Sequence, residues 1–356
     1  MIPGIQASIV FQCLMFILYL LIDGRLEALA NRIIFALLTV LAVHMLFNLL
    51  NQHILQEPLP NLVFGFGLLY GPFFYSYIKA LMHRDFTWKI TYFLHFSPGL
   101  ILSSVAVLKG VPGEVGAMLT FASMGVYLFI SLRSYWRFRR VVHQTQSAED
   151  LITMNWAAVV LSLNAIAILV NIISFSLSLL TDVTRLLLWS QISLFFVLLI
   201  VVNAFLFKGL TQPTLFAGIS DEDESIEQQS RKGSGLASLD EDVRTRIASN
   251  LHKHMENQRP YLDPMFSLQT LGRQLGETPR YVSLVINHSL QLNFADFVNN
   301  YRLADVKVCI SDEKDERNIL DIIYACGFST KSNFNRAFKK HEGMTPTEFK
   351  KRQQSC

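Results

Sequence analysis

Up to about residue 210 the chain is a succession of long apolar segments separated by short polar connections. Each segment has about the length that a helix needs to cross a bilayer, roughly 20 residues. No basic region precedes the first segment and no clear cleavage pattern follows it, so we interpret it as a retained span rather than a signal peptide. The pattern predicts a seven-helix transmembrane domain over residues 1–209, with spans at 5–22, 33–55, 61–82, 90–109, 114–135, 154–180 and 186–207.

Basic residues are distributed unequally among the connections. With the N-terminus outside, the outer connections hold Lys109 and Arg185. The inner connections hold the other ten: Arg25, Arg32, Lys79, Arg84, Lys89, Arg133, Arg137, Arg139, Arg140 and Lys208. Inner connections of membrane proteins are rich in Lys and Arg, so this bias predicts that everything after the seventh span lies in the cytoplasm. The whole-chain composition, 51% hydrophobic and 17% charged over 356 residues, averages an apolar first half and an ordinarily charged second half.

Three polar residues repeat every seven positions in the sixth segment and therefore share one face of a helix. They are Asn164, Asn171 and Ser178. One interpretation is that they line a ligand cavity. The other is that they form hydrogen bonds to neighbouring helices, which such residues commonly do inside membranes.

Histidines and small residues within the spans have structural interpretations. His44 and His95 are candidates for haem or quinone ligands, but two histidines without a defined spacing more often face the bundle or the membrane interface. In the third segment, small residues and a proline allow close helix packing or a bend. They are Gly65, Gly67, Gly71 and Pro72.

The sequence contains no recognisable pattern for catalysis or metal binding. There is no Ser-His-Asp order, no glycine-rich phosphate loop and no metal-ligand spacing. The four cysteines, Cys13, Cys309, Cys326 and Cys356, are expected to be reduced thiols. No Asp, Glu, Lys or Arg lies deep in a span, which argues against an ion-coupled transporter. We expect no enzyme activity and no cofactor.

Residues 210–238 form a polar stretch with an acidic run at 221–224 and a Gly-Ser-Gly run at 233–235. Such a stretch cannot bury enough apolar surface to order itself, so it is predicted to be a flexible tether. Its acidity could alternatively repel DNA or shield a basic face. From Leu239 a helical pattern begins with Val243, Ile247, Leu251 and Met255, which forms either the first helix of the next domain or a short dimer seam.

The last domain, residues 239–356, contains two predicted helix-turn-helix units. In the second, at about 318–341, Gly327 makes the turn and Ser329 or Thr330 caps a helix whose outer face is basic. In the first, at about 267–289, Ser267 caps a helix, Gly276 makes the turn, and Thr278 before Pro279 starts the next helix. A long helix starting at Asn293 joins the two units, and Thr345 with Glu348 forms a capping box for a final helix.

The stretch GFSTKSNFNRAFKKHEGMTPTEFKK, which begins at this turn, resembles the C-terminal signature of AraC-type transcription regulators. The likeness extends from about Ser249 to Arg352, and the apolar half weakly resembles the sensor half of membrane-bound members. Where the family usually has glycine at a helix end, this chain has Gln291, where a positive φ is expected to be costly. The family resemblance implies two recognition helices that read successive major-groove turns, roughly 34 Å apart.

Transferring the family's base-reading positions gives one set of residues in each unit. They are Arg280, Ser283 and Leu284 in the first and Lys331, Ser332, Asn335 and Arg336 in the second. Arg and Asn can each make two hydrogen bonds to a base edge. Arg302, Lys339 and Lys340 are predicted to bind phosphates. A solvated surface is the alternative for each cation alone, but seven basic against two acidic residues after Gly327 favour a DNA-binding face.

Together these patterns predict an all-α protein: a seven-helix transmembrane bundle followed by an AraC-like double helix-turn-helix domain. The predicted function is a transcription regulator in the bacterial cytoplasmic (inner) membrane that couples a signal to gene expression. Its expected partners are double-stranded DNA, the lipid bilayer and an unknown signal ligand or membrane partner, with a homodimer possible. The alternatives are a transporter or enzyme with a regulatory tail and a scaffold whose DNA-binding domain has decayed.

Overall fold

The computed structural model describes residues 2–53, 63–109, 111–148, 155–178, 184–211, 218–232, 240–312 and 317–354. Every regular element among them is a helix, as predicted. The chain divides into two compact units. We call residues 1–135 and 155–218 the apolar bundle, and residues 136–154 and 219–356 the C-terminal unit.

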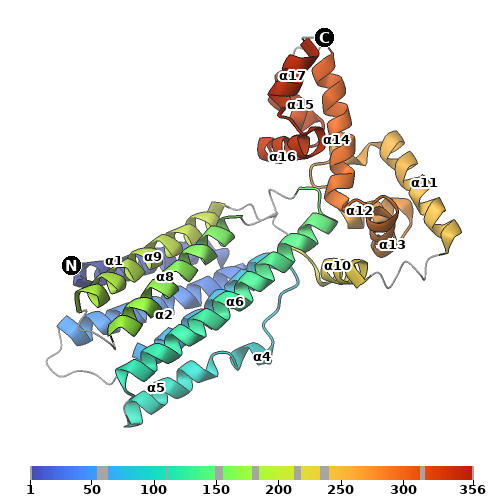
Figure 1. Ribbon diagram of the computed structural model, residues 1–356. Coiled ribbons are helices and arrows are strands. Elements are labelled where there is room, and N and C mark those ends of the chain that lie inside the picture. The colour runs from blue at the N-terminus through green and yellow to red at the C-terminus, as the bar shows by residue number, and fades with distance from the viewer. Residues whose placement is uncertain are drawn as a thin grey trace. The chain divides into compact units, whose positions relative to one another are not determined.

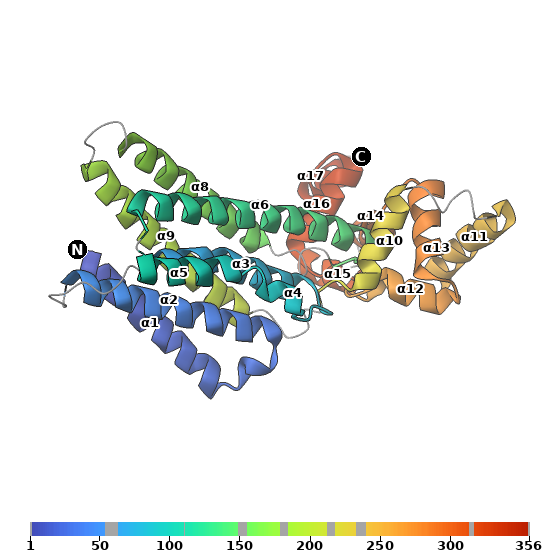
Figure 2. The ribbon, with the colours of Figure 1, turned by 90° about the horizontal axis from the view of Figure 1, so that it is seen from below.

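The apolar bundle has a helix in each of the seven predicted segments (Figures 1 and 2). Segment 90–109 contains two helices, because the helix is interrupted at Leu94–Phe96, just before Pro98. Within the described residues, five stretches are long and apolar enough to cross a membrane: Ile2–Ile22, Leu29–Asn51, Ile90–Lys109, Glu114–Thr145 and Asn155–Ser178. The helices are α1 (Ile2–Ile22), α2 (Leu29–His53), α3 (Val63–Met82), α4 (Ile90–Phe93), α5 (Ser97–Lys109), α6 (Gly113–Thr145), α8 (Asn155–Ser178) and α9 (Thr184–Thr211).

Close helix packing explains the glycines of α3. A Cβ at Gly65 would clash with the side chain of Ser103 on α5. At Gly71 it would come within 2.5 Å of the Tyr127 ring on α6. The predicted close packing of this segment is therefore confirmed, and α3 continues through Pro72 as one helix.

The C-terminal unit is arranged around one long helix, α14 (Phe294–Ser311), in Figure 1. Helices α10 to α13 gather at one end of α14 and helices α15 to α17 at the other. Each group has its own buried apolar cluster, centred on Phe297 and Phe338 respectively. The other helices are α10 (Asp221–Lys232), α11 (Glu241–Gln258), α12 (Leu268–Leu275), α13 (Pro279–Leu284), α15 (Ile319–Ala325), α16 (Lys331–Glu342) and α17 (Pro346–Gln354). A π-helical turn, Val285–Ser289, continues α13.

Helix starts in this unit follow the predicted caps. The side chain of Asn293 accepts a hydrogen bond from Asp296 N at 2.8 Å, and Thr330, rather than Ser329, accepts one from Asn333 N at 3.1 Å. Ser267 and Thr278 cap α12 and α13 in the same way. The Thr345 capping box also forms, and its hydrogen bonds lower the pKa of the Glu348 carboxyl. Gln291 adopts the positive φ, 54°, expected from the glycine it replaces.

Two predictions about the start of this unit have different outcomes. Ile247, Leu251 and Met255 of α11 are buried in the first apolar cluster, so α11 packs into the core of the domain, and these residues are not exposed as a dimer seam. The prediction of a flexible tether is wrong for residues 221–232, which form α10. A cap between Ser220 and Asp223 orders its first turn, and Ile226 joins the same cluster.

Candidate nucleic-acid interface

The second helix-turn-helix is built on a turn that only glycine fits. Gly327 has a φ of 87°, and a Cβ there would clash with the backbone of Tyr261 and Leu262. This close approach lets Phe328 enter the core, where it is fully buried and packs edge-on against Phe334 with ring centroids 5.4 Å apart. The turn therefore fixes α16 on α15 through a rigid aromatic contact.

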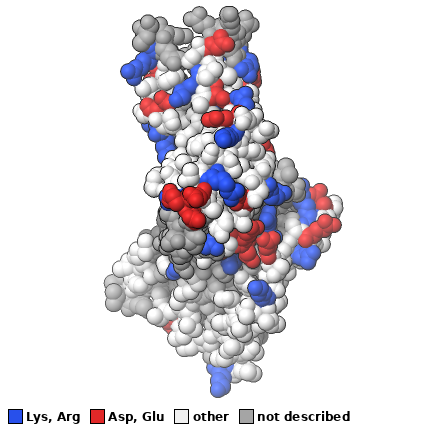
Figure 3. Space-filling model, turned by 90° about the vertical axis from the view of Figure 1, so that its right-hand side faces the viewer, with Lys and Arg blue, Asp and Glu red and all other residues white. Residues whose placement is uncertain are grey.

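The outer face of α16 carries all four residues predicted to read bases in this unit, and all four are exposed. They are Lys331, Ser332, Asn335 and Arg336. The opposite face, with Phe334 and Phe338, is buried. One guanidinium nitrogen of Arg336 donates to Asn333 Oδ1 at 3.2 Å, which orients the side chain along the helix. Charged groups gather over the C-terminal unit in the face drawn in Figure 3, whereas most of the apolar bundle there is white.

The C-terminal end of α16 is tied to α14 by ion pairs. Lys307 donates to Glu342 Oε1 at 2.8 Å, and this hydrogen bond is the main reason that the pKa of the Glu342 carboxyl lies below its usual value. Lys340, predicted to bind phosphate, donates to both carboxylate oxygens of Asp296, at 2.7 and 2.6 Å. Lys339 is exposed. Asp296 therefore competes with a phosphate for the ammonium group of Lys340.

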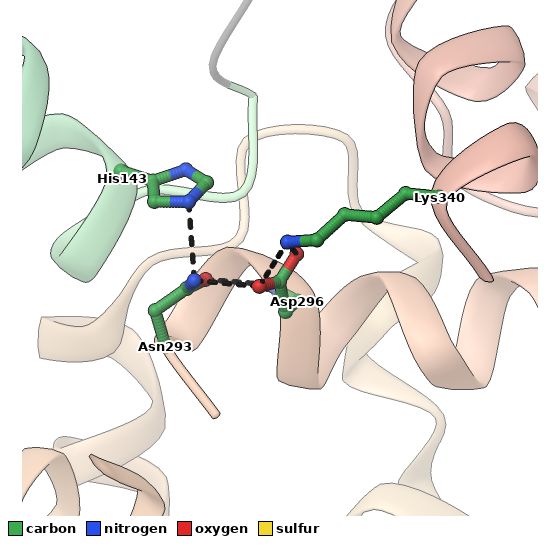
Figure 4. Close-up of polar contacts among 4 residues, drawn as sticks. All are labelled: His143, Asn293, Asp296 and Lys340. Atoms are coloured by element: carbon green, nitrogen blue, oxygen red, sulfur yellow. Dashed lines mark hydrogen bonds and ion pairs between the residues drawn. The ribbon is translucent and has the colours of Figure 1, made fainter. Parts of the chain in front are cut away.

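The contacts of Asp296 extend beyond Lys340 (Figure 4). Asn293 Nδ2 donates to Asp296 Oδ2 at 2.6 Å and lies 3.1 Å from Nε2 of His143, near the end of α6. Since Lys340 is on α16, these four side chains form a continuous polar chain from the end of α6 to the exposed second recognition helix.

Arg302 does not have its predicted place on the surface. Its side chain is 0% exposed. It donates to Tyr261 O at 2.7 Å, to Asp263 O at 2.8 Å and to Ser147 Oγ at 3.1 Å. Burial lowers the pKa of the guanidinium to about 10. The prediction that Arg302 binds phosphate is therefore wrong for this conformation, because its guanidinium is buried and donates to backbone carbonyls instead.

The first helix-turn-helix forms as predicted, but its reading face is covered. Ser283 is 2% exposed and Leu284 0%, while Arg280 is half-buried with a buried Nε that has no hydrogen-bond partner among the described residues. Base reading by Ser283 and Leu284 therefore does not fit this conformation. The sequence did not predict this burial, nor the packing against α13 of a helix, α10, that lies about 55 residues earlier in the chain.

Helix α10 is an element that covers α13. The two helices pack together. Ile226 shares a buried cluster with Val282 of α13, and Asp223 accepts a hydrogen bond from Gln269 of α12. The first turn of α10 is entirely acidic. A helix whose first turn is negatively charged, as a DNA backbone is, thus lies against the first recognition helix.

The end of α6 also belongs to the C-terminal unit. Ser147 donates to Phe266 O at 2.6 Å and accepts from Arg302, while its neighbour Gln146 forms a bridge with Ser267. Nearer the middle of α6, Arg137 pairs with Glu224 of α10 at 2.9 Å. Sequence reasoning missed these residues. The signal in the sequence that pointed to them was the basic, polar composition of residues 136–147. We had explained this composition by the excess of Lys and Arg expected in an inner connection.

The polar residues of the apolar bundle bond locally. Asn164, Asn171 and Ser178 each donate to a carbonyl of their own helix, at 2.8, 2.9 and 2.7 Å; among the described residues, none of the three bonds across helices as one interpretation expected. His44 pairs with Tyr70 and His95 with Tyr127. Among the residues that the structure describes, no cluster of three or more His, Cys, Asp or Glu could hold a metal ion.

Comparison with known proteins agrees with this geometry. A family model described as a helix-turn-helix domain matches residues 271–352. The C-terminal domain is an AraC-type helix-turn-helix domain. Its two helix-turn-helix motifs, α12–α13 and α15–α16, account for the paired caps and turns described above.

Three relatives show how far the similarity extends. The chain is 27% identical over 89 residues to the uncharacterized HTH-type transcriptional regulator YtdP of Bacillus subtilis and 25% identical over 89 residues to the melibiose operon regulatory protein of Escherichia coli. It is 26% identical over 104 residues to the probable transcription factor PqrA of Proteus vulgaris. These matches cover 25%, 25% and 29% of this chain, and 11%, 29% and 83% of the relatives. No solved structure matches the chain significantly.

Proposed function

We propose that this protein is a membrane-embedded transcription regulator that binds specific DNA sequences. The observation that carries the proposal is the α16 face: a helix of an AraC-type domain that exposes Lys331, Ser332, Asn335 and Arg336 together. A recognition helix enters the major groove with such a face, and Asn and Arg can each make two hydrogen bonds to base edges. Lys339 lies on the same exposed side and suits a phosphate contact.

Two features support a position in the bacterial inner membrane. Five apolar stretches could cross a bilayer by length and composition, and their exposed surfaces carry large apolar side chains such as Phe11, Leu100 and Phe129. The excess of Lys and Arg in alternate connections favours an outside N-terminus and a cytoplasmic DNA-binding domain. DNA is accessible only on that side.

Regulation would act on the first helix-turn-helix. In this structure α16 is exposed while α13 is covered by α10. We propose that this is a low-affinity state with one recognition helix available. When α10 leaves, Arg280 becomes able to reach bases and a second groove can be bound, which raises affinity because the two helices are rigidly joined by α14.

The end of α6 supplies the route for a signal. It pairs with α10 through Arg137 and Glu224, holds the α12 region through Ser147, and reaches the α16 region through His143. A shift of α6 would disturb all three contacts. Coupling of this kind needs an element with two alternative positions, whose equilibrium the signal shifts. In this proposal the element is α10, which is either packed on α13 or detached from it.

A selection from random DNA duplexes tests the DNA-binding proposal. The full chain in lipid nanodiscs should enrich a defined sequence, and Lys331→Ala with Asn335→Ala should remove the preference, because each bidentate pair of hydrogen bonds to a base contributes about 1–3 kcal/mol. Lys253→Ala, at an exposed position of α11, is the matched control and should leave enrichment unchanged. No enriched sequence from either the full chain or the fragment 219–356 would refute the proposal.

The covering role of α10 is tested by loosening its contact. Ile226→Asp places a charge in the buried cluster beneath α10, so that α10 should detach and the preferred site should lengthen to include a second half. Gln228→Asp adds the same charge at an exposed position of α10 and is the control. An unchanged site length in Ile226→Asp, with α10 shown to be detached by hydrogen exchange, would contradict the covering role.

A further inference from the structure

The apolar bundle contains a pocket to which α2, α3, α6, α8 and α9 all contribute. The empty space in it is about 760 Å³, which includes the part that is open to the surroundings. No charged side chain is found among the described residues of its wall, which is mostly aliphatic and aromatic.

Three polar groups interrupt this apolar wall: the hydroxyls of Tyr70 and Tyr127 and the amide of Asn164. Asn164 donates one of its two Nδ2 hydrogens to Val160 O at 2.8 Å, and its carbonyl oxygen Oδ1 is an acceptor. The Tyr127 hydroxyl lies 2.8 Å from His95 Nδ1. In the tautomer with an unprotonated Nδ1, the tyrosine donates to the imidazole and keeps its oxygen as an acceptor. The pocket thus offers acceptor oxygens to a hydrogen-bond donor.

A second observation comes from His44, which lies next to the pocket. Its Nδ1 is 2.5 Å from the Tyr70 hydroxyl, and its ring stacks on Phe66 with centroids 5.2 Å apart. The side chain is more than nine-tenths buried, and its Nε2 has no hydrogen-bond partner among the described residues. A buried polar atom without a partner is unfavourable, so the polar pair beside the pocket is incomplete as it stands.

We propose that this pocket binds a neutral lipophilic small molecule with an apolar body and one or two uncharged hydroxyl or similar donor groups. A charged ligand is disfavoured because no lining residue could pair with its charge in an apolar site. The apolar body would pack against residues such as Leu41, Leu128 and Ile168, and the donor would bond to Asn164 Oδ1. The role of this ligand as the regulator's signal rests on the proposed function. The binding of the ligand does not.

One helix links this pocket to the C-terminal unit. Met124, Tyr127 and Leu128 of α6 line the wall. The same helix continues to Thr145, and its last ten residues belong to the C-terminal unit. The Tyr127 ring packs against Gly71, where a Cβ would come within 2.5 Å of it. On the proposed function, a ligand in this pocket would act on the C-terminal unit through this helix, which carries His143 and precedes Ser147.

The test uses the full chain in lipid nanodiscs and two photoreactive probes of equal length: dodecanol and dodecanoate, each with a diazirine in the chain. After illumination, labelled peptides are mapped by mass spectrometry. We expect saturable labelling of α6 around Met124–Leu128 by the alcohol, competition by unlabelled dodecanol, and at least tenfold weaker labelling by the carboxylate. Labelling that does not saturate, or that is equal for both probes, would overturn the proposal.

Three variants complete the test. Leu128→Trp fills the pocket and should reduce alcohol labelling at least tenfold. Asn164→Leu keeps the size of the side chain but removes the acceptor, and should reduce it severalfold; it also carries the test if Leu128→Trp does not fold. Phe129→Trp changes the neighbouring, 64% exposed position and should leave labelling unchanged. Equal labelling in Asn164→Leu and Phe129→Trp would reject the site. None of these readouts involves DNA, so this proposal and the DNA-binding proposal can fail separately.

Discussion

Replacement of Arg302 by methionine separates a structural role from a DNA-binding role. Methionine keeps most of the apolar stem of the side chain but removes the donors to Tyr261 O, Asp263 O and Ser147 Oγ. Hydrogen bonds from a charged group contribute about 1.5–3 kcal/mol each, while burial of the guanidinium itself costs several kcal/mol. Tyr261 O loses the donor Arg302 Nε, whereas Asp263 O still accepts from Phe266 N at 3.1 Å. We therefore expect a net loss of about 3 kcal/mol from the hydrogen bonds removed.

Thermal and urea unfolding of the fragment 219–356 measures this loss. That fragment retains Tyr261 and Asp263 and both buried clusters, though not Ser147. A loss of about 3 kcal/mol or more corresponds to a fall in Tm of roughly 10 °C or more for a domain of this size. Arg336→Met, at an exposed position of α16, is the control and should change stability by no more than about 0.5 kcal/mol.

The salt dependence of DNA binding distinguishes a structural Arg302 from one that binds phosphate. If Arg302 bound a phosphate, Arg302→Met would leave Tm unchanged and would reduce the slope of log affinity against log salt by about one. The buried geometry predicts the reverse: a large fall in Tm and, well below that Tm, an unchanged slope. An unchanged Tm together with a reduced slope would show that our assignment of this residue is wrong.

Three further predictions concern α16 and its supports. Gly327→Ala should destabilise the domain by at least about 3 kcal/mol, whereas Gly343→Ala, with a similar φ but open space around it, should cost about 1 kcal/mol in the same unfolding assay. Asp296→Ala frees Lys340 and should increase the salt slope of DNA binding by about one; an unchanged slope would mean that Lys340 does not reach DNA. Because the pKa of Glu342 is lowered on folding, its stabilisation is present above the ordinary glutamate pKa of about 4.3 and is lost as pH falls below it, so Glu342→Gln should reduce the acid sensitivity of the Tm.

Local features of this protein were predictable from sequence because their causes are local. Ser267, Thr278, Asn293 and Thr345 cap helices by bonding to backbone groups three residues away. The apolar length of the first seven segments predicts helices for the same reason. The exposed face of α16 follows from its helical periodicity alone, which is why all four residues predicted there lie where expected.

Features that depend on distant parts of the chain were not predictable. The sequence suggests that Arg302 is an exposed cation, yet its side chain is buried and donates to carbonyls about 40 residues earlier in the chain. From the sequence, Ser283 and Leu284 were expected on an exposed helix face, yet both are buried in a unit where α10 packs against α13. The acidic composition of α10 suggested a solvated tether, and the single apolar residue Ile226 gave little indication of a docked helix. The alternative that its acidity shields a basic face is closer to the observed arrangement.

The covalent connection of α10 has a thermodynamic consequence for any DNA that competes with it. α10 ends at Lys232 and α11 begins at Glu241, so α10 stays near α13 at an effective concentration of roughly millimolar order. On the proposed function, DNA that occupies both recognition helices must bind the population in which α10 is detached, and its apparent Kd in that mode is the intrinsic Kd divided by that population. An open fraction of about 1% would weaken this mode of binding about a hundredfold. On that proposal, the length of the connection between α10 and α11 helps to set how far a signal can change DNA affinity, independently of any contact with DNA.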